Sequence, residues 1–186
     1  MGEPAKRPAT YEDLCALPGH LVGEIINGML HANPRPALRH ARASSRLGAA
    51  LDGPFDRGHG GPGGWIILDE PELHFHGEVY VPDLAGWRRE RMPEMPHTAA
   101  CELAPDWVCE VLSPKTAVLD RSEKLPGYAR EGVAFAWLVD PILETLEAYV
   151  LEREHWLLLG TWTGNAKVRV TPFAELELDL SALWAR

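Results

Sequence analysis

The 186-residue chain is 46% hydrophobic, which is enough to bury a sizeable core in one domain. Its net charge of −9 argues mildly against a basic nucleic-acid-binding protein, and its seven tryptophans and 24% charged residues argue against disorder. The sequence lacks a membrane-length apolar run and an apolar signal segment, and its three cysteines show no paired spacing, so we expect a reduced cytoplasmic protein with no membrane partner.

The N-terminal residues 1–8 are predicted to form a loose arm on a single domain that spans residues 1–186. A short helix over Tyr11–Leu17 is expected next. Thr10 and Asp13 have the spacing of a capping box, with Asp in place of the usual Glu or Gln. No internal repeat or low-complexity linker divides the chain.

A β-hairpin is predicted where Asn27-Gly28 separates two apolar runs, because this dipeptide suits the tight turn between antiparallel strands. Glu24 lies on the first of these strands. A carboxylate at this position is either exposed on the strand or part of a functional site, and the local pattern leaves both interpretations open.

The segment from Ala37 to about Leu51, which follows Pro36, is predicted to be a helix. Arg39, Arg42 and Arg46 form one stripe along it, which is either a solvated helix face or a stripe that binds nucleic-acid phosphates. His40, near the start of the helix, is either structural or part of a catalytic site.

Two strands are expected after a glycine-rich loop, the first beginning at Trp65. His74 and His76 alternate with Phe75, which would place both histidines on one strand face, but no further ligands with suitable spacing indicate zinc. The next strand, Val79–Leu84, carries Asp83 among apolar residues.

The stretch Asp106–Lys124 is the most informative part of the chain. Trp107–Leu112 is predicted to be a buried strand, yet Glu110 lies in its middle. An ionised carboxylate is costly to bury unless it is paired, bound to a metal or protonated. A helical segment after a Ser-Pro turn should place Asp120 and Lys124 on one face.

The C-terminal part is predicted to be rich in strands. The expected elements are strands over Val133–Val139, Thr145–Leu151, His155–Thr163 and Lys167–Val170, followed by an amphipathic piece over Leu178–Trp184. The complete order of elements predicts an α/β or α+β domain with a central mixed sheet flanked by helices.

Asp83 and Glu110 could together bind Mg²⁺ or Mn²⁺, since these cations prefer oxygen ligands, and the carbonyl of Val111 could be a third ligand. Lys124 could then stabilise a phosphoryl transition state while Asp120 holds its ammonium group. Alternatively, Glu110 and Lys124 form a purely structural ion pair.

An ordered series of motifs from Glu24 onward resembles the Uma-type restriction endonucleases of the PD-(D/E)XK nuclease superfamily. The matching residues are Glu24 to Gly28, His40, Val81-Pro82-Asp83, Glu110 to Pro114, Asp120, Lys124, Tyr128, Gly132-Val133 and Trp137 to Pro141. The resemblance implies a restriction-endonuclease-like fold and Mg²⁺- or Mn²⁺-dependent hydrolysis of DNA. It implies catalytic roles for Asp83, Glu110 and Lys124, with Glu24 and His40 as auxiliaries.

The chain departs from the superfamily pattern in two ways. The lysine expected two residues after the second acid is Leu112 here, whereas the Uma-type group carries it on the next helix, as Lys124 does. Pro126 then predicts a kink or break just past Lys124, which leaves the direction of Tyr128 open.

Two other functions remain open: a non-catalytic interaction or regulatory protein that keeps the nuclease fold, and a metal-dependent hydrolase of another phosphoester. Nucleases that cut both DNA strands often act as twofold dimers. The apolar segment Trp156–Trp162 is the expected homodimer interface.

Overall fold

The chain forms two main β-sheets, which the computed structural model describes within residues 7–184. The five-stranded sheet contains β1 (Leu21–Ile26), β2 (Met29–Pro34), β4 (Glu72–Phe75), β5 (Glu78–Tyr80) and β7 (Ala100–Cys101), in the spatial order β2-β1-β5-β4-β7. The six-stranded sheet contains β3 (Trp65–Asp69), β6 (Leu84–Arg88), β8 (Trp107–Val111), β9 (Phe135–Asp140), β10 (Thr145–Glu152) and β11 (His155–Thr163), in the order β11-β10-β9-β8-β6-β3. Each sheet contains one parallel pair among antiparallel ones, so the expected mixed α/β architecture is confirmed.

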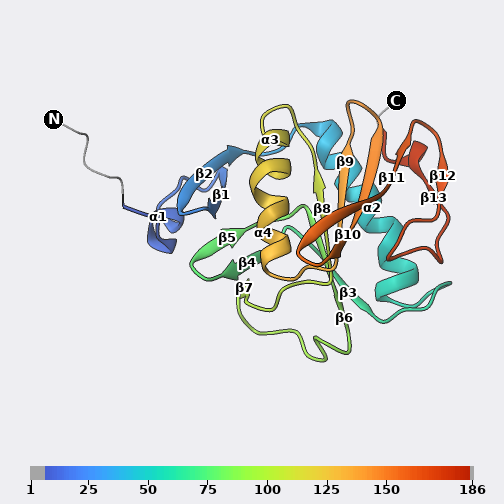
Figure 1. Cartoon of the computed structure of the whole chain (residues 1–186), viewed down its shortest axis with the longest axis horizontal. Helices are drawn as coiled ribbons and strands as arrows, with labels where there is room; N and C mark the ends of the chain where they lie inside the picture. Colours follow the sequence, from blue (N-terminus) through green and yellow to red (C-terminus); the bar gives the residue numbers. More distant parts are fainter. Residues whose placement is uncertain (1–6, 185–186) are drawn as a thin grey trace.

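The helices are few and mostly short. They are α1 (Tyr11–Cys15), α2 (Leu38–Leu51), α3 (Ala117–Leu119) and α4 (Leu125–Arg130), with the π-helical turns η1 (Asp52–Asp56) and η2 (Asp120–Lys124) and the 3₁₀ turn η3 (Leu180–Ala182). Figure 1 shows α1, β1 and β2 at one end of the molecule and the small pair β12 (Lys167–Val168) and β13 (Leu178–Asp179) at the other. No helix within residues 7–184 has the length and apolar character needed to cross a membrane.

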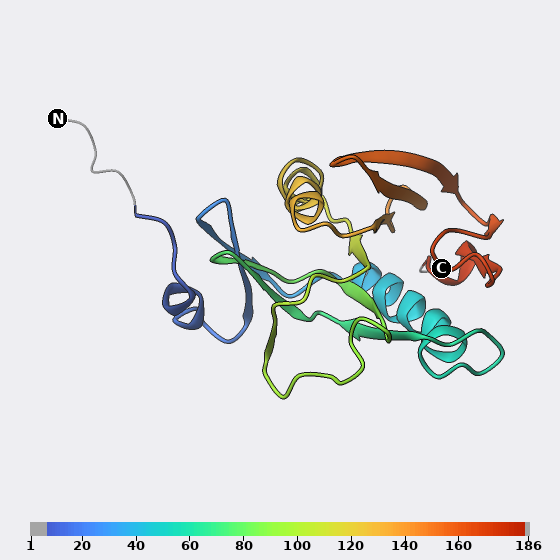
Figure 2. The ribbon, with the colours of Figure 1, turned by 60° about the horizontal axis from the view of Figure 1, so that its bottom comes forward.

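Strand β8 is buried on both faces between α2 and α4 (Figure 2). Its odd-numbered residues belong to the core cluster that includes Leu47 of α2, whereas Val108 belongs to the cluster that includes Tyr128 of α4. Successive side chains of a strand point to opposite faces. The alternation therefore directs Glu110 toward α4 rather than toward α2.

Local signals near the N-terminus are confirmed. Asn27 and Gly28 have φ angles of 51° and 70°, as the turn between β1 and β2 requires, and Thr10 and Asp13 form the expected capping box. Helix α1 is shorter than expected and ends at Cys15. Residues 1–6 of the expected arm lie outside the described residues, and Arg7 pairs with Asp13.

The single strand expected over residues 79–84 is wrong. Strand β5 ends at Tyr80 and β6 begins at Leu84, so Asp83 lies in the link that joins the two sheets. Pro82 has no N–H to donate to a ladder, which accounts for the interruption. His76 lies in the β4–β5 turn with a φ angle of 52°, so it does not share a strand with His74 as expected.

The helical segment around Lys124 also differs from the prediction. It is not broken after the lysine: α3, η2 and α4 follow one another directly, and Pro126 lies in the first turn of α4. Proline cannot donate the N–H of an α-helical bond to the preceding turn. The π-helical turn η2, which ends at Lys124 just before α4, accommodates the missing N–H of Pro126.

Candidate active site

Asp83 is held where the two sheets meet. Leu84 pairs with Cys109 across β6 and β8, which brings the preceding Asp83 beside Glu110. The N–H of Val111 donates to Oδ2 of Asp83 at 2.7 Å, and the N–H of Glu70 donates to its backbone carbonyl at 3.2 Å. The two acids predicted to act together therefore lie side by side, Asp83 just before β6 and Glu110 on β8.

Glu110 is buried on the α4 side of β8. Its Oε1 accepts a hydrogen bond from the Tyr128 hydroxyl at 2.5 Å and lies 2.8 Å from Nζ of Lys124. Burial raises the pKa of Glu110 well above its ordinary value, although Lys124 opposes this shift. Tyr128, whose direction the sequence left open, thus points at Glu110.

Lys124 lies at the centre of three carboxylates. Its Nζ is 2.8 Å from Oε1 of Glu24 and of Glu110, and 3.9 Å from Oδ1 of Asp120. Burial alone would lower the pKa of Lys124, but these three carboxylates raise it well above its usual range. Only 3% of the side chain is exposed, so Lys124 is a buried charged residue that lines the site rather than one that solvent reaches freely.

Glu24 connects the five-stranded sheet to this cluster. It is buried on β1, so the interpretation as an exposed strand carboxylate is wrong. Its Oε1 accepts the N–H of Val81 at 2.9 Å as well as the Lys124 ammonium. Val81 lies in the same link as Asp83, so Glu24 helps to fix the position of that link.

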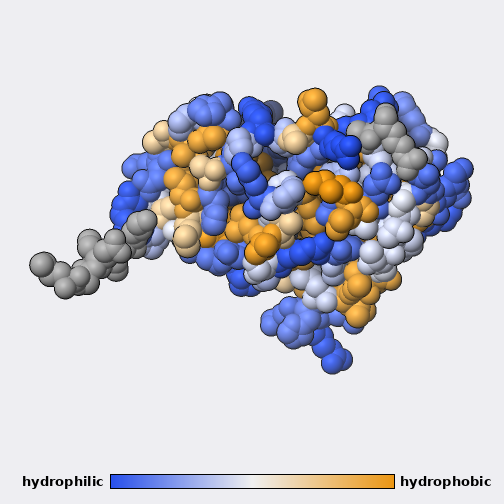
Figure 3. All heavy atoms as spheres, turned by 90° about the horizontal axis from the view of Figure 1, so that it is seen from above, coloured by the Kyte–Doolittle hydropathy of each residue, from blue (hydrophilic) through white to orange (hydrophobic). Residues whose placement is uncertain are grey.

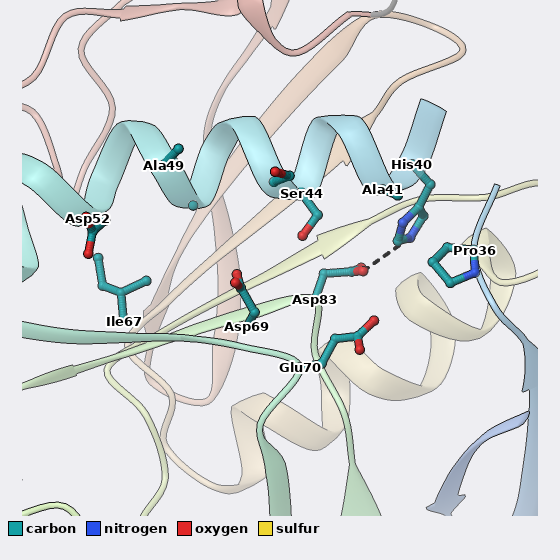
Figure 4. A pocket seen from close by; sticks show the side chains of 12 residues that line it. Pro36, His40, Ala41, Ser44, Ala49, Asp52, Ile67, Asp69, Glu70 and Asp83 are labelled. Atoms are coloured by element: carbon teal, nitrogen blue, oxygen red, sulfur yellow. Dashed lines mark ion pairs between the residues drawn. The ribbon is translucent and has the colours of Figure 1, made fainter. Parts of the chain in front are cut away.

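His40 reaches Asp83 from α2. Its Nε2 lies 3.3 Å from Oδ1 of Asp83 (Figure 4). Burial alone would lower the pKa of His40, but Asp83 and a backbone hydrogen bond with Val111 raise it above its ordinary value. The imidazole therefore lies beside Asp83 and Val111, two of the three residues that the sequence analysis suggested as metal ligands.

Two connected hollows form the surface of the site. The candidate catalytic cavity, with a volume of about 430 Å³, is lined by Glu24, Asp83, Glu110, Asp120 and Lys124 among others. A second hollow of about 480 Å³ runs along α2 and shares Pro36, His40, Glu70 and Asp83 with the first (Figure 4). The His40–Asp83 pair lies where the two hollows meet.

The sequence analysis missed Glu70, which lines both hollows. It is an exposed residue with a φ angle of 45°, in the left-handed region that few non-glycine residues adopt. No local sequence signal marked it, because its proximity to Asp83 depends on the pairing of β3 with β6.

Other predicted residues lie elsewhere. Arg39, Arg42 and Arg46 line neither hollow, and Nε of Arg42 donates to the carbonyl of Trp184 at 3.4 Å. His74 contacts Glu72 at 2.7 Å, whereas His76 lies 3.6 Å from Glu131. The two histidines thus face different acids, which gives no support to a shared zinc site.

The cavity offers the donor atoms that a hard divalent cation prefers. Asp83 and Glu110 supply carboxylates, and the contacts of Glu110 involve Oε1, which leaves Oε2 for a cation. Both oxygens of Asp83 already have partners, so a cation would compete with His40 for Oδ1. Within residues 7–184 no three His, Cys, Asp or Glu side chains are grouped closely enough to hold a metal ion by themselves.

Comparisons with known proteins agree on family and fold. The model of the Uma2 family, described as "Putative restriction endonuclease", matches residues 8–182. Five chains among the solved structures match. One is a crystal structure described as a "putative nuclease belonging to DUF820" from Anabaena variabilis ATCC 29413; it is 24% identical, has a TM-score of 0.74, and the match covers 95% of this chain and 98% of that one. No curated protein matches.

Proposed function

Because this chain belongs to the Uma2 family of restriction-endonuclease-like proteins, we propose that it is a Mg²⁺- or Mn²⁺-dependent endonuclease that hydrolyses phosphodiester bonds in DNA. The family and the fold are those of a nuclease. The observation that carries the proposal is the pair Asp83 and Glu110: Asp83 lies just before β6, Glu110 lies on the neighbouring β8, and both line one cavity next to a lysine.

In this proposal Asp83, Glu110 and the carbonyl of Val111 hold the cation. When bound, the cation would lower the pKa of a water molecule and offset negative charge on the phosphoryl oxygens. Tyr128 and Lys124 fix Glu110 in one orientation through its Oε1. The amide of Val111 orients Asp83 through Oδ2, and Oδ1, which His40 contacts, would be the oxygen that takes the cation.

Lys124 supplies the fixed positive charge of the site. Its pKa, raised by the surrounding carboxylates, keeps the ammonium group protonated at neutral pH. A charge held in a buried position stabilises a transition state without reorganising when the reaction occurs. Asp83 raises the pKa of His40, which favours a protonated imidazole at the point where the catalytic cavity meets the second hollow; in that form His40 could transfer a proton to a leaving oxygen there.

A homodimer is the second part of the proposal. Strand β11 is the edge of its sheet, and three consecutive leucines on it are well exposed: Leu157 at 50%, Leu158 at 50% and Leu159 at 43%. A twofold axis lets the same edge pair with itself in a second copy. The proposed contact is edge to edge, and on the face shown in Figure 3 apolar residues form separate patches among hydrophilic ones.

We also propose a cytoplasmic location. Cys15, Cys101 and Cys109 are free, and burial raises the pKa of both Cys101 and Cys109. Free buried thiols suit a reducing compartment.

A plasmid-nicking assay tests the proposed reaction. The wild type should convert supercoiled DNA in Mg²⁺ or Mn²⁺ but not in a chelator, and Asp83→Asn should lower the rate on the order of 100-fold or more. Glu90→Gln is the control that should cut DNA like the wild type, because Glu90 is exposed and lines neither hollow. If the wild type fails to cut DNA with either metal, the non-catalytic alternative replaces the nuclease.

A further inference from the structure

Most basic side chains in this protein already contact other parts of the chain. Examples are Arg57 with Asp52, Arg89 with Asp56, Arg91 with Asp106 and Arg121 with Glu147. Among the lysines and arginines of residues 7–184, those without a hydrogen bond, ion pair, ring contact or electrostatic interaction with an acid are Arg35, Arg39, Arg46, Lys115 and Arg153. These five are the cations available to a ligand.

Two of the five line the catalytic cavity. Arg35 lies in the link between β2 and α2, and Lys115 lies in the turn between β8 and α3; both are exposed. They reach one cavity from different sheets, since β2 belongs to the five-stranded sheet and β8 to the six-stranded one. Arg35 and Lys115 are therefore exposed cations on the wall of the cavity that contains Asp83 and Glu110.

The negative charge inside the cavity suggests why Arg35 and Lys115 matter for a phosphate-containing ligand. Five carboxylates line it, from Glu24, Glu70, Asp83, Glu110 and Asp120, whereas Lys124 is already surrounded by three of them. This wall repels the phosphates that flank a bound phosphodiester, even when a metal ion offsets part of its charge. Cations at the exposed positions would offset that repulsion for a polynucleotide.

We propose that Arg35 and Lys115 form a phosphate clamp, which binds backbone phosphates on the two sides of the phosphodiester held at Asp83 and Glu110. This inference rests on the proposed nuclease function and assigns the residues that bind the DNA backbone on either side of the cleaved bond. The guanidinium of Arg35 can bind a phosphate with two parallel hydrogen bonds, and the ammonium of Lys115 acts as a point charge.

The arginine stripe of α2 is less suited to this role. The α2 residues that line the two hollows are His40, Ala41, Ser44, Ser45, Gly48 and Ala49, and none of the three arginines is among them. Figure 4 shows His40 and Ser44 on the side of α2 that faces Asp83. Arg42 instead contacts the C-terminal segment at Trp184. If the clamp binds DNA, substitution of Arg35 and Lys115 should weaken binding; if the α2 stripe binds DNA, substitution of its arginines should do so instead.

Fluorescence anisotropy with a labelled DNA duplex in Ca²⁺, with the DNA checked for intactness afterwards, separates the two. The double variant Arg35→Gln/Lys115→Gln should raise Kd roughly tenfold or more at about 0.15 M salt. The slope of log K against log salt should fall by about 0.9 for each lost phosphate contact. Its Mn²⁺ affinity and melting temperature should match the wild type, because neither side chain contacts the buried cluster.

Two control variants make the result specific. Arg39→Gln/Arg46→Gln removes the same charge from the α2 stripe, and Arg153→Gln removes an unpartnered arginine from the β10–β11 turn. Both should bind DNA with Kd and salt slope close to the wild type. Unchanged binding by the Arg35/Lys115 variant, or an equal loss per removed charge in all three variants, overturns the clamp while leaving the nuclease in place. Absence of DNA binding by the wild type at any salt concentration overturns both.

Discussion

Oε1 of Glu110 receives both the Lys124 ammonium, at 2.8 Å, and the Tyr128 hydroxyl, at 2.5 Å. One oxygen thus takes two donors from the same helical segment, and the other oxygen is left for a ligand. The relationship explains why a carboxylate can occupy the middle of a fully buried strand. It also makes Lys124 important to the fold as well as to the proposed chemistry.

Lys124→Ala should lower the free energy of unfolding by about 3–5 kcal/mol, because it leaves buried carboxylates without their cation. A catalytic lysine at a solvent-reached position would contribute little to the free energy of unfolding, whereas Lys124 is buried among its partners. Denaturant unfolding measures the effect, with Lys115→Ala as the exposed control. A loss below about 1 kcal/mol would contradict the role of this ion pair.

Asp120→Asn should change the pH dependence of stability in the chelated protein. Burial raises the pKa of Asp120 to about 6, so the folded state binds a proton more tightly than the unfolded state. The stability linked to this proton is complete below the unfolded pKa of 3.8 and is lost as pH rises through about 6. The variant should therefore gain stability over the wild type between about pH 4 and pH 7, by up to roughly 3 kcal/mol. Denaturant unfolding at several pH values measures this, and a stability difference independent of pH would contradict it.

The proton of His40 should respond to Asp83. In Asp83→Asn, burial would act without the neighbouring charge, so the pKa of His40 should fall below its wild-type value. Addition of Mn²⁺ or Mg²⁺ to the wild type should lower it too. NMR titration of the imidazole, with Mg²⁺ to avoid paramagnetic broadening, follows both changes. Equal pKa values for His40 in the variant and the wild type would contradict the contact between His40 and Asp83.

Strand β11 should determine the oligomeric state. Light scattering at a protein concentration of roughly tens of micromolar should give twice the chain mass for the wild type. Leu158→Lys should give a monomer, since it places a charge on the proposed contact strand. Val118→Lys, at a 76% exposed position on α3, is the matched control and should remain dimeric. A monomeric wild type would rule out the proposed homodimer.

Local sequence patterns predicted the elements that carry the site. The buried strand around Glu110, the Asn27-Gly28 hairpin and the helix after Pro36 could all be identified, because each depends on periodicity or turn chemistry within a few residues. The same patterns placed Asp83 and Glu110 on adjacent strands; Asp83 in fact lies just before β6, and the pairing of Leu84 with Cys109 brings it beside Glu110 on β8.

Features that depend on long-range packing could not be predicted in this way. The position of Glu70 and the approach of Arg35 and Lys115 to one cavity depend on how two sheets meet. The burial of Glu24 has the same cause, since its partner Lys124 lies 100 positions further along the chain. The interruption at Pro82 was missed for a different reason: the apolar residues around it resembled one continuous strand.

The most direct test of the metal centre is a crystal soaked in Mn²⁺ and measured for anomalous scattering. The account predicts a peak between Asp83 and Glu110, with ligand distances of about 2.0–2.2 Å, and its loss in Asp83→Asn. Calorimetry on the same two proteins should show Mn²⁺ binding by the wild type and little by the variant. An empty site at saturating Mn²⁺, or equal affinity in both proteins, would contradict the assignment of Asp83 and Glu110 as the metal-binding pair.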